Sequence, residues 1–152
     1  MVFVNEIAEI VHSQVNKYGG AANKNIGDAF LLVWKLIFDF EETKKLTINS
    51  SNEKLDPGFD RIKNNDLNRQ LAELSLLSFV EIIIDIETKA KILKYKDHSS
   101  LKEKLPGYRV KMGFGLHVGW AIEGAIGSSY KIDASYLSPN VNMASRLEAA
   151  TK

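Results

Sequence analysis

Two short segments carry residues whose types and spacing suit chemistry on a nucleotide phosphate. The run Asn23–Phe30 places a lysine, Lys24, four positions before a carboxylate, Asp28, with a glycine directly before that carboxylate. Near the other end of the chain, Asn142 and Arg146 are also four positions apart, which puts both on one face of a helix. A carboxylate can bind a metal ion, amide and ammonium groups can donate to a base edge, and an arginine can stabilise phosphoryl charge.

Each of these residues also has an ordinary structural explanation. Aspartate is common after glycine in a hairpin, so Asp28 could serve the turn alone. Lys24 could be a solvated strand residue, and Asn142 with Arg146 could form the polar face of a terminal helix. Considered singly, the structural and the chemical interpretation both stay open for every one of them.

The elements that carry the first segment follow from the spacing of apolar side chains. Residues 3–18 are predicted to form a helix, because apolar residues recur at helical spacing until Tyr18-Gly19-Gly20 interrupts them. Residues 21–25 and 29–36 are predicted to be two short strands around a hairpin turn. The second strand is apolar throughout its first half, so we expect it to be buried on both faces.

The middle of the chain has a different character. Residues 39–65 are polar and rich in turn formers, which predicts a mobile loop. A helix is then predicted to begin with Asn65 or Asp66 as its N-cap and to run to about Ile86. Residues 89–104 are strongly charged, so we expect a solvated linker or a helix end there.

The last third of the chain returns to regular patterns. Residues 108–118 alternate between apolar and other residues, which predicts a strand with one face in the core, and residues 119–127 are its expected antiparallel partner. Ser138 and Pro139 are a typical N-cap and first helical residue. The order α-β-β-(insertion, α)-β-β-α predicts an α+β fold with helices layered on an antiparallel sheet. The last helix is expected to bury Met143, Leu147 and Ala150.

Composition limits the function further. The 152 residues fit one domain, and the net charge of +1 gives no reason to expect nucleic acid or an anionic membrane as a partner. The absence of cysteine excludes disulfides and thiolate metal sites and fits a reducing compartment. No apolar run approaches the ~20 residues of a membrane span, and the first residues lack the pattern of a signal peptide. The sequence begins almost inside a helix pattern, as expected of a piece of a longer protein.

Two segments together resemble one known family. The pattern Ile26-Gly27-Asp28-Ala29-Phe30 and the eight residues Val141–Glu148 are similar to motifs in the catalytic domain of class III adenylyl and guanylyl cyclases. The resemblance implies a ferredoxin-like antiparallel sheet with helices packed on it. It also implies conversion of ATP to 3′,5′-cyclic AMP and pyrophosphate. The alternatives are a guanylyl cyclase and a non-catalytic cyclase-homology module that dimerises or regulates a partner.

The resemblance assigns roles to four residues. Asp28 matches the family's metal-binding aspartate, Asn142 the asparagine that orients the ribose, and Arg146 the arginine that stabilises the phosphates in the transition state. Lys24 occupies the position that contacts the purine, where lysine is typical of adenylyl cyclases and glutamate of guanylyl cyclases. A lysine ammonium can donate to adenine N1 but offers no acceptor to the N–H groups of guanine, so Lys24 favours ATP over GTP.

Ser135 lies at the family's second purine-selecting position, seven residues before Asn142, and its hydroxyl can accept from the adenine amino group. Asp133 could take this place if the loop bulges. His117, on an alternating segment, is expected to be a packed or edge histidine rather than a catalyst. The glycines between 113 and 127 resemble the family's strand pair and form no Walker or dinucleotide pattern.

The resemblance also implies cofactors and partners. By similarity, each site holds two Mg²⁺ or Mn²⁺ ions and forms between two protomers, in a homodimer or in a heterodimer with another cyclase domain. One protomer would supply Asp28 and a further aspartate. Its partner would supply the residues for the purine, ribose and phosphates, which are Lys24, Ser135, Asn142 and Arg146.

The resemblance covers residues 1–36 and 107–152, with 39–106 expected to be an insertion of a loop and a helix. The family's other metal-binding aspartate would precede Met1, and its late phosphate-binding lysine would follow Lys152. We therefore expect a single partial cyclase domain that is inactive or nearly so in isolation. Its expected place is the cytoplasmic side, either free or within a larger membrane-attached protein, with no direct membrane contact of its own.

Overall fold

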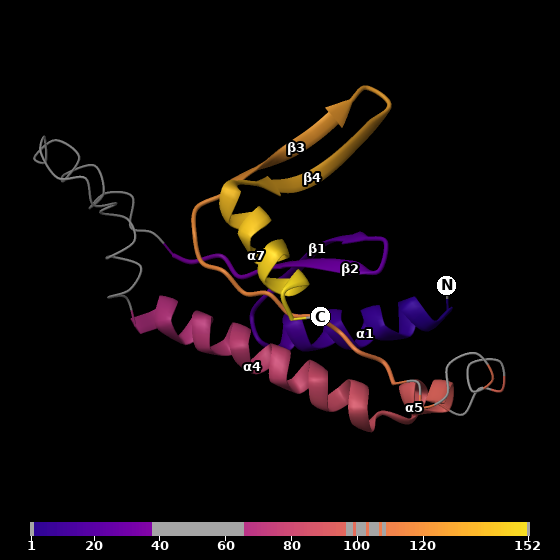
Figure 1. The fold of residues 1–152 in the computed structure, drawn as a ribbon. Coiled ribbons are helices and arrows are strands. Elements are labelled where there is room, and N and C mark those ends of the chain that lie inside the picture. The colour runs from indigo at the N-terminus through magenta and orange to yellow at the C-terminus, as the bar shows by residue number, and fades with distance from the viewer. Residues whose placement is uncertain are drawn as a thin grey trace, which may run out of the picture.

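The computed structural model describes residues 2–37, 66–96, 99, 103, 107 and 109–151. The predicted loop at 39–65 and Asn65, one of the two predicted N-caps, lie outside these residues. Antiparallel hairpins and helices make up the described chain, so the α+β prediction is confirmed (Figure 1). The elements are α1 (Val2–Lys17), β1 (Ala21–Ile26), β2 (Ala29–Val33), α4 (Asp66–Thr88), α5 (Ala90–Lys96), β3 (Ile122–Ser128), β4 (Lys131–Leu137) and α7 (Pro139–Ala149).

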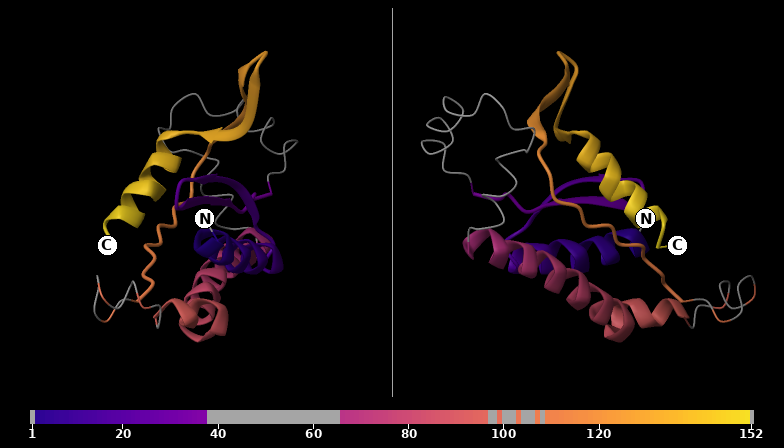
Figure 2. Two further views of the ribbon diagram at one scale, coloured as in Figure 1. Left: turned by 90° about the vertical axis from the view of Figure 1, so that its right-hand side faces the viewer. Right: turned by 60° about the vertical axis from the view of Figure 1, so that its left-hand side comes forward.

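The hydrophobic core lies where three helices meet. α1 and α4 lie side by side and run in opposite directions, and α5 follows α4 near the start of α1 (Figure 1, Figure 2). An amide–carboxylate hydrogen bond of 2.6 Å from Gln14 to Asp85 also joins α1 to α4. Of the apolar residues at helical spacing on α1, all but Val4, which is half-buried, are buried, so this helix prediction is confirmed. The core consists of Ile7, Ile10, Val11, Val15, Ile82, Ile86 and Ile92.

The segment expected to be a solvated linker or a helix end contains a separate helix, α5, that contributes to this core. Ile92 of α5 is only 3% exposed. On either side of it, Lys91 and Lys94 pair with Glu9 and Glu6 of α1 at 3.3 and 2.5 Å. The high charge of residues 89–96 therefore reflects one side of a packed helix and its ion pairs, rather than a solvated linker.

The predicted pairing of residues 108–118 with 119–127 is wrong. Residues 109–121 form no strand, and β3 pairs instead with β4, its neighbour in sequence, from Ile122 opposite Leu137 to Ser128 opposite Lys131. The alternation in 108–118 was nevertheless informative, because Val110, Met112 and Phe114 pack against the core. Alternation shows which side chains face the core, but it does not identify a hydrogen-bonding partner.

Two burial predictions also need correction. β2 is half-buried rather than enclosed on both faces, and its first residue, Ala29, is exposed. In α7 no residue is buried; Met143 and Leu147 are each 40% exposed, and Ala150 at its C-cap is exposed as well. The reason for the second difference is that α7 lies against an extended segment on one side, outside the three-helix core (Figure 1).

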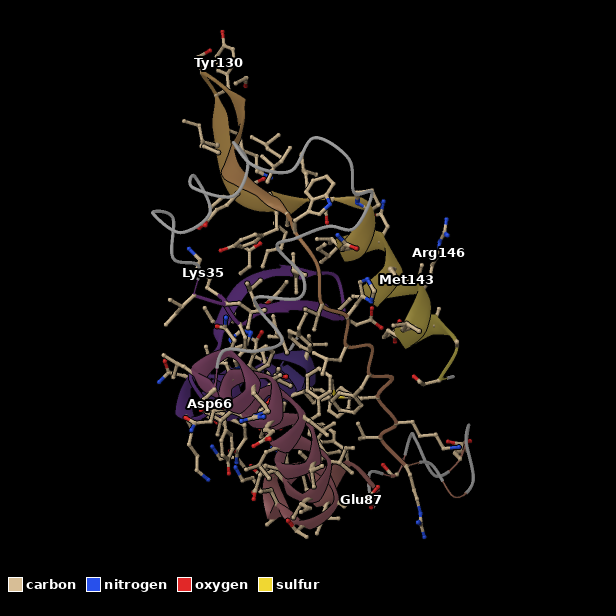
Figure 3. The ribbon with its side chains drawn as sticks, turned by 90° about the vertical axis from the view of Figure 1, so that its left-hand side faces the viewer. Lys35, Asp66, Glu87, Tyr130, Met143 and Arg146 are labelled. Carbon is tan, nitrogen blue, oxygen red and sulfur yellow. The ribbon has the colours of Figure 1, made fainter. Side chains whose placement is uncertain are left out.

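In the part of the chain that the structure describes, the strands form two separate two-stranded sheets, β1–β2 and β3–β4, which side chains connect. The Asn23 amide on β1 donates to the carbonyl of Ala134 on β4 at 3.4 Å. After β2, Lys35 Nζ lies 2.7 Å from Glu123 Oε1 on β3. The β3–β4 hairpin projects beyond these links to its tip at Tyr130, which is 97% exposed (Figure 3). The position of this hairpin therefore depends on a few polar contacts.

The ion pair shifts the pKa of both partners. The hydrogen bond from Lys35 lowers the pKa of Glu123 below its ordinary value of 4.5, and the same bond raises the pKa of Lys35 above 10.5. Both groups are therefore charged at neutral pH, and the link is complete there.

We expect Ile82→Ala to destabilise the fold by about 2–5 kcal/mol, because Ile82 is fully buried and its removal leaves a cavity. The matched control is Ile83→Ala, one residue later in α4 and 46% exposed, which should cost less than about 1 kcal/mol. Both changes alter helix propensity equally, so denaturant unfolding isolates burial. Equal destabilisation by the two variants would contradict the assigned core.

We expect Glu123→Gln to lower the melting temperature at neutral pH but not in acid. A folded-state pKa below 4.5 means that the stabilisation is complete above pH 4.5 and disappears as the pH falls through the lowered value. The measurement is the difference in melting temperature between the parent and the variant from neutral pH to below 4.5. A difference that stays constant across this range would show that the carboxylate does not hold the hairpin. Glu87→Gln, at an exposed site on α4, is the control.

Candidate functional site

Asp28 lies at the tip of the β1–β2 hairpin and is exposed. Gly27 before it has a φ of +64°, a conformation that residues with a Cβ rarely adopt, so the turn requires glycine there. Ile26 and Ala29 close the hairpin as opposed residues. Within the described ranges no hydrogen bond or ion pair engages the Asp28 carboxylate, which leaves its oxygens available to a ligand.

The strand that carries Lys24 is bound to the strand that carries Ser135. Lys24 is half-buried and stands opposite Leu31, at a point where the β1–β2 register shifts. The residue before it, Asn23, makes the 3.4 Å hydrogen bond to the carbonyl of Ala134, the residue before Ser135. Lys24 and Ser135, the two predicted purine-selecting residues, are far apart in sequence. Each directly follows one partner of this hydrogen bond.

The structure treats Ser135 and Asp133 differently. Ser135 is half-buried on β4 opposite Gly124, so no side chain on the neighbouring strand crowds it from that position. Asp133 is exposed, and its carboxylate lies 3.2 Å from the ammonium of Lys131 on the same strand. The Asp133 carboxylate thus has a cationic partner on its own strand.

The residue after Ser135 belongs to the link between the sheets. Burial raises the pKa of Tyr136, and its hydrogen bond with Glu123 raises it further. Lys35 lies 5.9 Å from the centre of the Tyr136 ring, in a cation–π contact. This side of Ser135 is thus fixed by the same Lys35–Glu123 pair that positions the hairpin.

Asn142 and Arg146 lie one turn apart on α7, and both are exposed. The helix begins as predicted, with the Ser138 side chain accepting hydrogen bonds from the main-chain N–H groups of Asn140 and Val141, each at 3.1 Å. Figure 3 shows the Arg146 side chain extending away from α7 and from the rest of the molecule. No hydrogen bond or ion pair in the described part of the chain joins Arg146 to Asp28.

Sequence reasoning assigned no role to Asn23, to Asn140 or to the face of the extended segment that meets α7. The signal for Asn23 was an asparagine inside a predicted strand, where this residue is unfavourable. Its Oδ1 atom is buried without a hydrogen-bond partner among the described residues, a costly arrangement for a structural residue. His117 was expected to be a packed or edge histidine, and it makes a 3.1 Å contact with Asn140.

The side chains of the candidate site offer one position that suits a divalent metal ion. Hard cations such as Mg²⁺ bind oxygen ligands, and the exposed, unengaged carboxylate of Asp28 fits one such position. No group of three or more His, Cys, Asp or Glu residues that could hold a metal occurs in the described ranges. Asp28 alone could therefore supply only part of the ligand set of such an ion.

Within residues 2–37, 66–96 and 109–151, no helix has both the length and the apolar character needed to cross a membrane. α4 is the longest, with 23 residues, and it carries several charged side chains.

Comparisons with known proteins agree on the type of domain. A family model described as the adenylate and guanylate cyclase catalytic domain matches residues 1–152, including the segment expected to be an insertion. The chain is 35% identical over 60 residues to an adenylate cyclase of Anabaena cylindrica. The matched region covers 39% of this chain and 12% of that protein.

Two solved structures of a bacterial light-regulated adenylyl cyclase have a similar fold. Their TM-scores are 0.58 and 0.60 at 24% and 25% identity, and each comparison covers 99% of this chain. This chain spans 57% of the first solved chain and 32% of the second. Because the family model matches the whole sequence, the chain belongs to the adenylate and guanylate cyclase catalytic domain family.

Proposed function

We propose that the chain forms part of a catalytic domain that cyclises ATP to 3′,5′-cyclic AMP and releases pyrophosphate. The observation that supports this most directly is the Asn23–Ala134 hydrogen bond, because it holds the strand of Lys24 beside the strand of Ser135. These two residues are the donor and the acceptor that an adenine edge requires. The similarity to an adenylate cyclase and to adenylyl cyclase structures supports the same choice.

Lys24 and Ser135 provide discrimination between the two purines. The Lys24 ammonium donates to adenine N1, and the Ser135 hydroxyl accepts from the adenine amino group. Guanine presents N–H donors where adenine presents N1, so Lys24 would face a donor and leave that donor unpaired. A buried polar group without a partner costs about 1–3 kcal/mol, which is enough to select ATP over GTP.

Asn142 and Arg146 act on the sugar and phosphates. Asn142 orients the ribose so that its 3′-hydroxyl points at the α-phosphate. Arg146, one turn later, presents a planar guanidinium to phosphate oxygens as negative charge develops on them. Asp28 would hold Mg²⁺ or Mn²⁺, two ions per site, which when bound activate the hydroxyl and neutralise triphosphate charge.

The site forms between two protomers, in a homodimer or with another cyclase domain. This proposal rests on the exposure of Asp28 and Arg146 and on the outward direction of the Arg146 side chain (Figure 3). A partner placed against this side could bring its own metal-binding carboxylates within reach of Arg146. The absence of cysteine fits work in the cytosol, and the small net charge fits partners other than nucleic acid.

One observation also fits a second candidate function. The described ranges contain no group of three or more carboxylates and histidines that could hold a metal ion. A non-catalytic module that dimerises with an active cyclase and regulates it would lack such a group too. Such a module would bind nucleotide without turning it over. Product formation by the native polypeptide distinguishes the two.

We expect the native polypeptide that carries this chain to form cyclic AMP with Mg²⁺ or Mn²⁺ and to prefer ATP to GTP. Lys24→Glu should lower the ratio of kcat/KM for ATP to that for GTP by about 10-fold or more, because it replaces a donor with an acceptor. Product chromatography with each nucleotide measures the ratio. Lys111→Glu, an equal charge change at an exposed position, is the control. Better turnover of GTP by the parent would identify a guanylyl cyclase, and no turnover would favour the regulatory module.

We expect Arg146→Ala to lower kcat and kcat/KM together, by about 10²-fold or more, since its contact is made mainly in the transition state. Steady-state kinetics on the native polypeptide measures both constants. Ser145→Ala, at the neighbouring exposed position of α7, should leave them nearly unchanged. A rise in KM alone would make Arg146 a ground-state contact and contradict the role given to it.

A further inference from the structure

The extended segment between residues 113 and 119 lies directly on α7, and alternate positions face the helix. At Gly113, Gly115 and Gly119 an added Cβ would come within 3.0 Å of atoms of α7 or of Thr151 just beyond it. His117 occupies the remaining position of the same alternation, between Gly115 and Gly119. Because the other three residues are glycines, His117 is the only one of the four that contacts the helix with a side chain.

His117 meets Asn140 in the first turn of α7. Its Nε2 atom lies 3.1 Å from Asn140 Oδ1, and Asn140 Nδ2 donates to the carbonyl of Trp120 at 3.0 Å. The second bond fixes the orientation of the amide, because reversing it would set two carbonyl oxygens against each other. Since Oδ1 can only accept, Nε2 of His117 must carry the hydrogen. The Asn140 side chain thus joins the segment to the helix through two bonds of defined direction.

The other end of α7 is fixed to the same segment. The main-chain N–H of Phe114 donates to Thr151 Oγ1 at 3.2 Å, and that hydroxyl donates to the carbonyl of Glu148 at 2.7 Å. The helix between these anchors carries Asn142 and Arg146. Arg146 lies six residues after Asn140, a rise of about 9 Å along the axis, so a rotation or slide at the first turn moves its guanidinium.

We propose that His117 and Asn140 are a positioning pair for the reaction, which sets the rotation and axial position of α7 and hence the placement of Asn142 and Arg146. This proposal rests on the proposed function. His117 acts through Asn140 and does not itself touch the substrate. A displacement of about 1 Å in a positioned group can cost about 10²-fold in rate, so the loss of this pair should be seen mainly in kcat.

The test compares two variants of His117 in the native polypeptide. His117→Leu removes the donor and should lower kcat by about 10-fold or more with a smaller change in KM. His117→Gln keeps an N–H donor that can reach Asn140 Oδ1 and should restore most of kcat. Val118→Ala, on the opposite alternation and 39% exposed, is the control. Equal losses in the leucine and glutamine variants, or full kcat in His117→Leu, would overturn the positioning role.

A spectroscopic measurement tests the geometry without activity. In mildly alkaline solution, ¹⁵N NMR of the histidine ring should show the hydrogen of His117 on Nε2, and His117→Leu should shift the side-chain amide signals of Asn140. A hydrogen on Nδ1 would overturn the pair itself. If the Nε2 form is found but the native polypeptide makes no cyclic nucleotide, the positioning role falls together with the proposed function, and the error lies in the function. If the Nε2 form is found and the parent is active, the kinetics decide.

Discussion

The arrangement of the candidate site depends on the polar link between the two sheets, which consists of the Asn23–Ala134 hydrogen bond and the Lys35–Glu123 ion pair. Within a sheet, backbone ladders fix neighbouring strands, but no ladder joins β1–β2 to β3–β4 in the described chain. The relative position of Lys24 and Ser135 therefore follows from this bond and from the Lys35–Glu123 pair. Polar contacts of this kind are weaker than ladders and are sensitive to single substitutions, whereas the helical core beneath depends on buried apolar area.

The helices could be predicted from sequence because their evidence is local. Apolar spacing identified the buried face of α1, and Ser138 with Pro139 identified the start of α7, since an N-cap needs only the next few residues. For a physical reason, the alternating pattern at 108–118 could not show that residues 109–118 are extended but unpaired. An extended segment and a paired strand have the same two-residue alternation, and only the presence of a partner distinguishes them. Here the glycines of this segment face α7, and β3 pairs with β4 across a short turn.

In the candidate site, too, local features could be predicted from the sequence and long-range contacts could not. Asp28, Lys24, Asn142 and Arg146 stand in short motifs, so their types and spacing were visible in the sequence. The contacts that position them join distant residues: Asn23 and Ala134 are 111 positions apart, and His117 and Asn140 are 23 apart. No local pattern reports such an approach. The outward direction of Arg146 is likewise a property of the packed helix, and its spacing from Asn142 could indicate only a shared face.

The glycines of the chain differ in how much mutational change they can accommodate. Gly124 on β3 has no heavy atom near the place where a side chain would begin, so alanine fits there sterically. Gly113 and Gly115 have no such space, because an added Cβ would strike the backbone of α7, which cannot rotate aside. Even one methyl group at these sites would force the segment off the helix. Among the glycines of the described chain, the fold should therefore accept alanine at Gly124 on the projecting hairpin and reject it at Gly113 and Gly115 along the contact with α7.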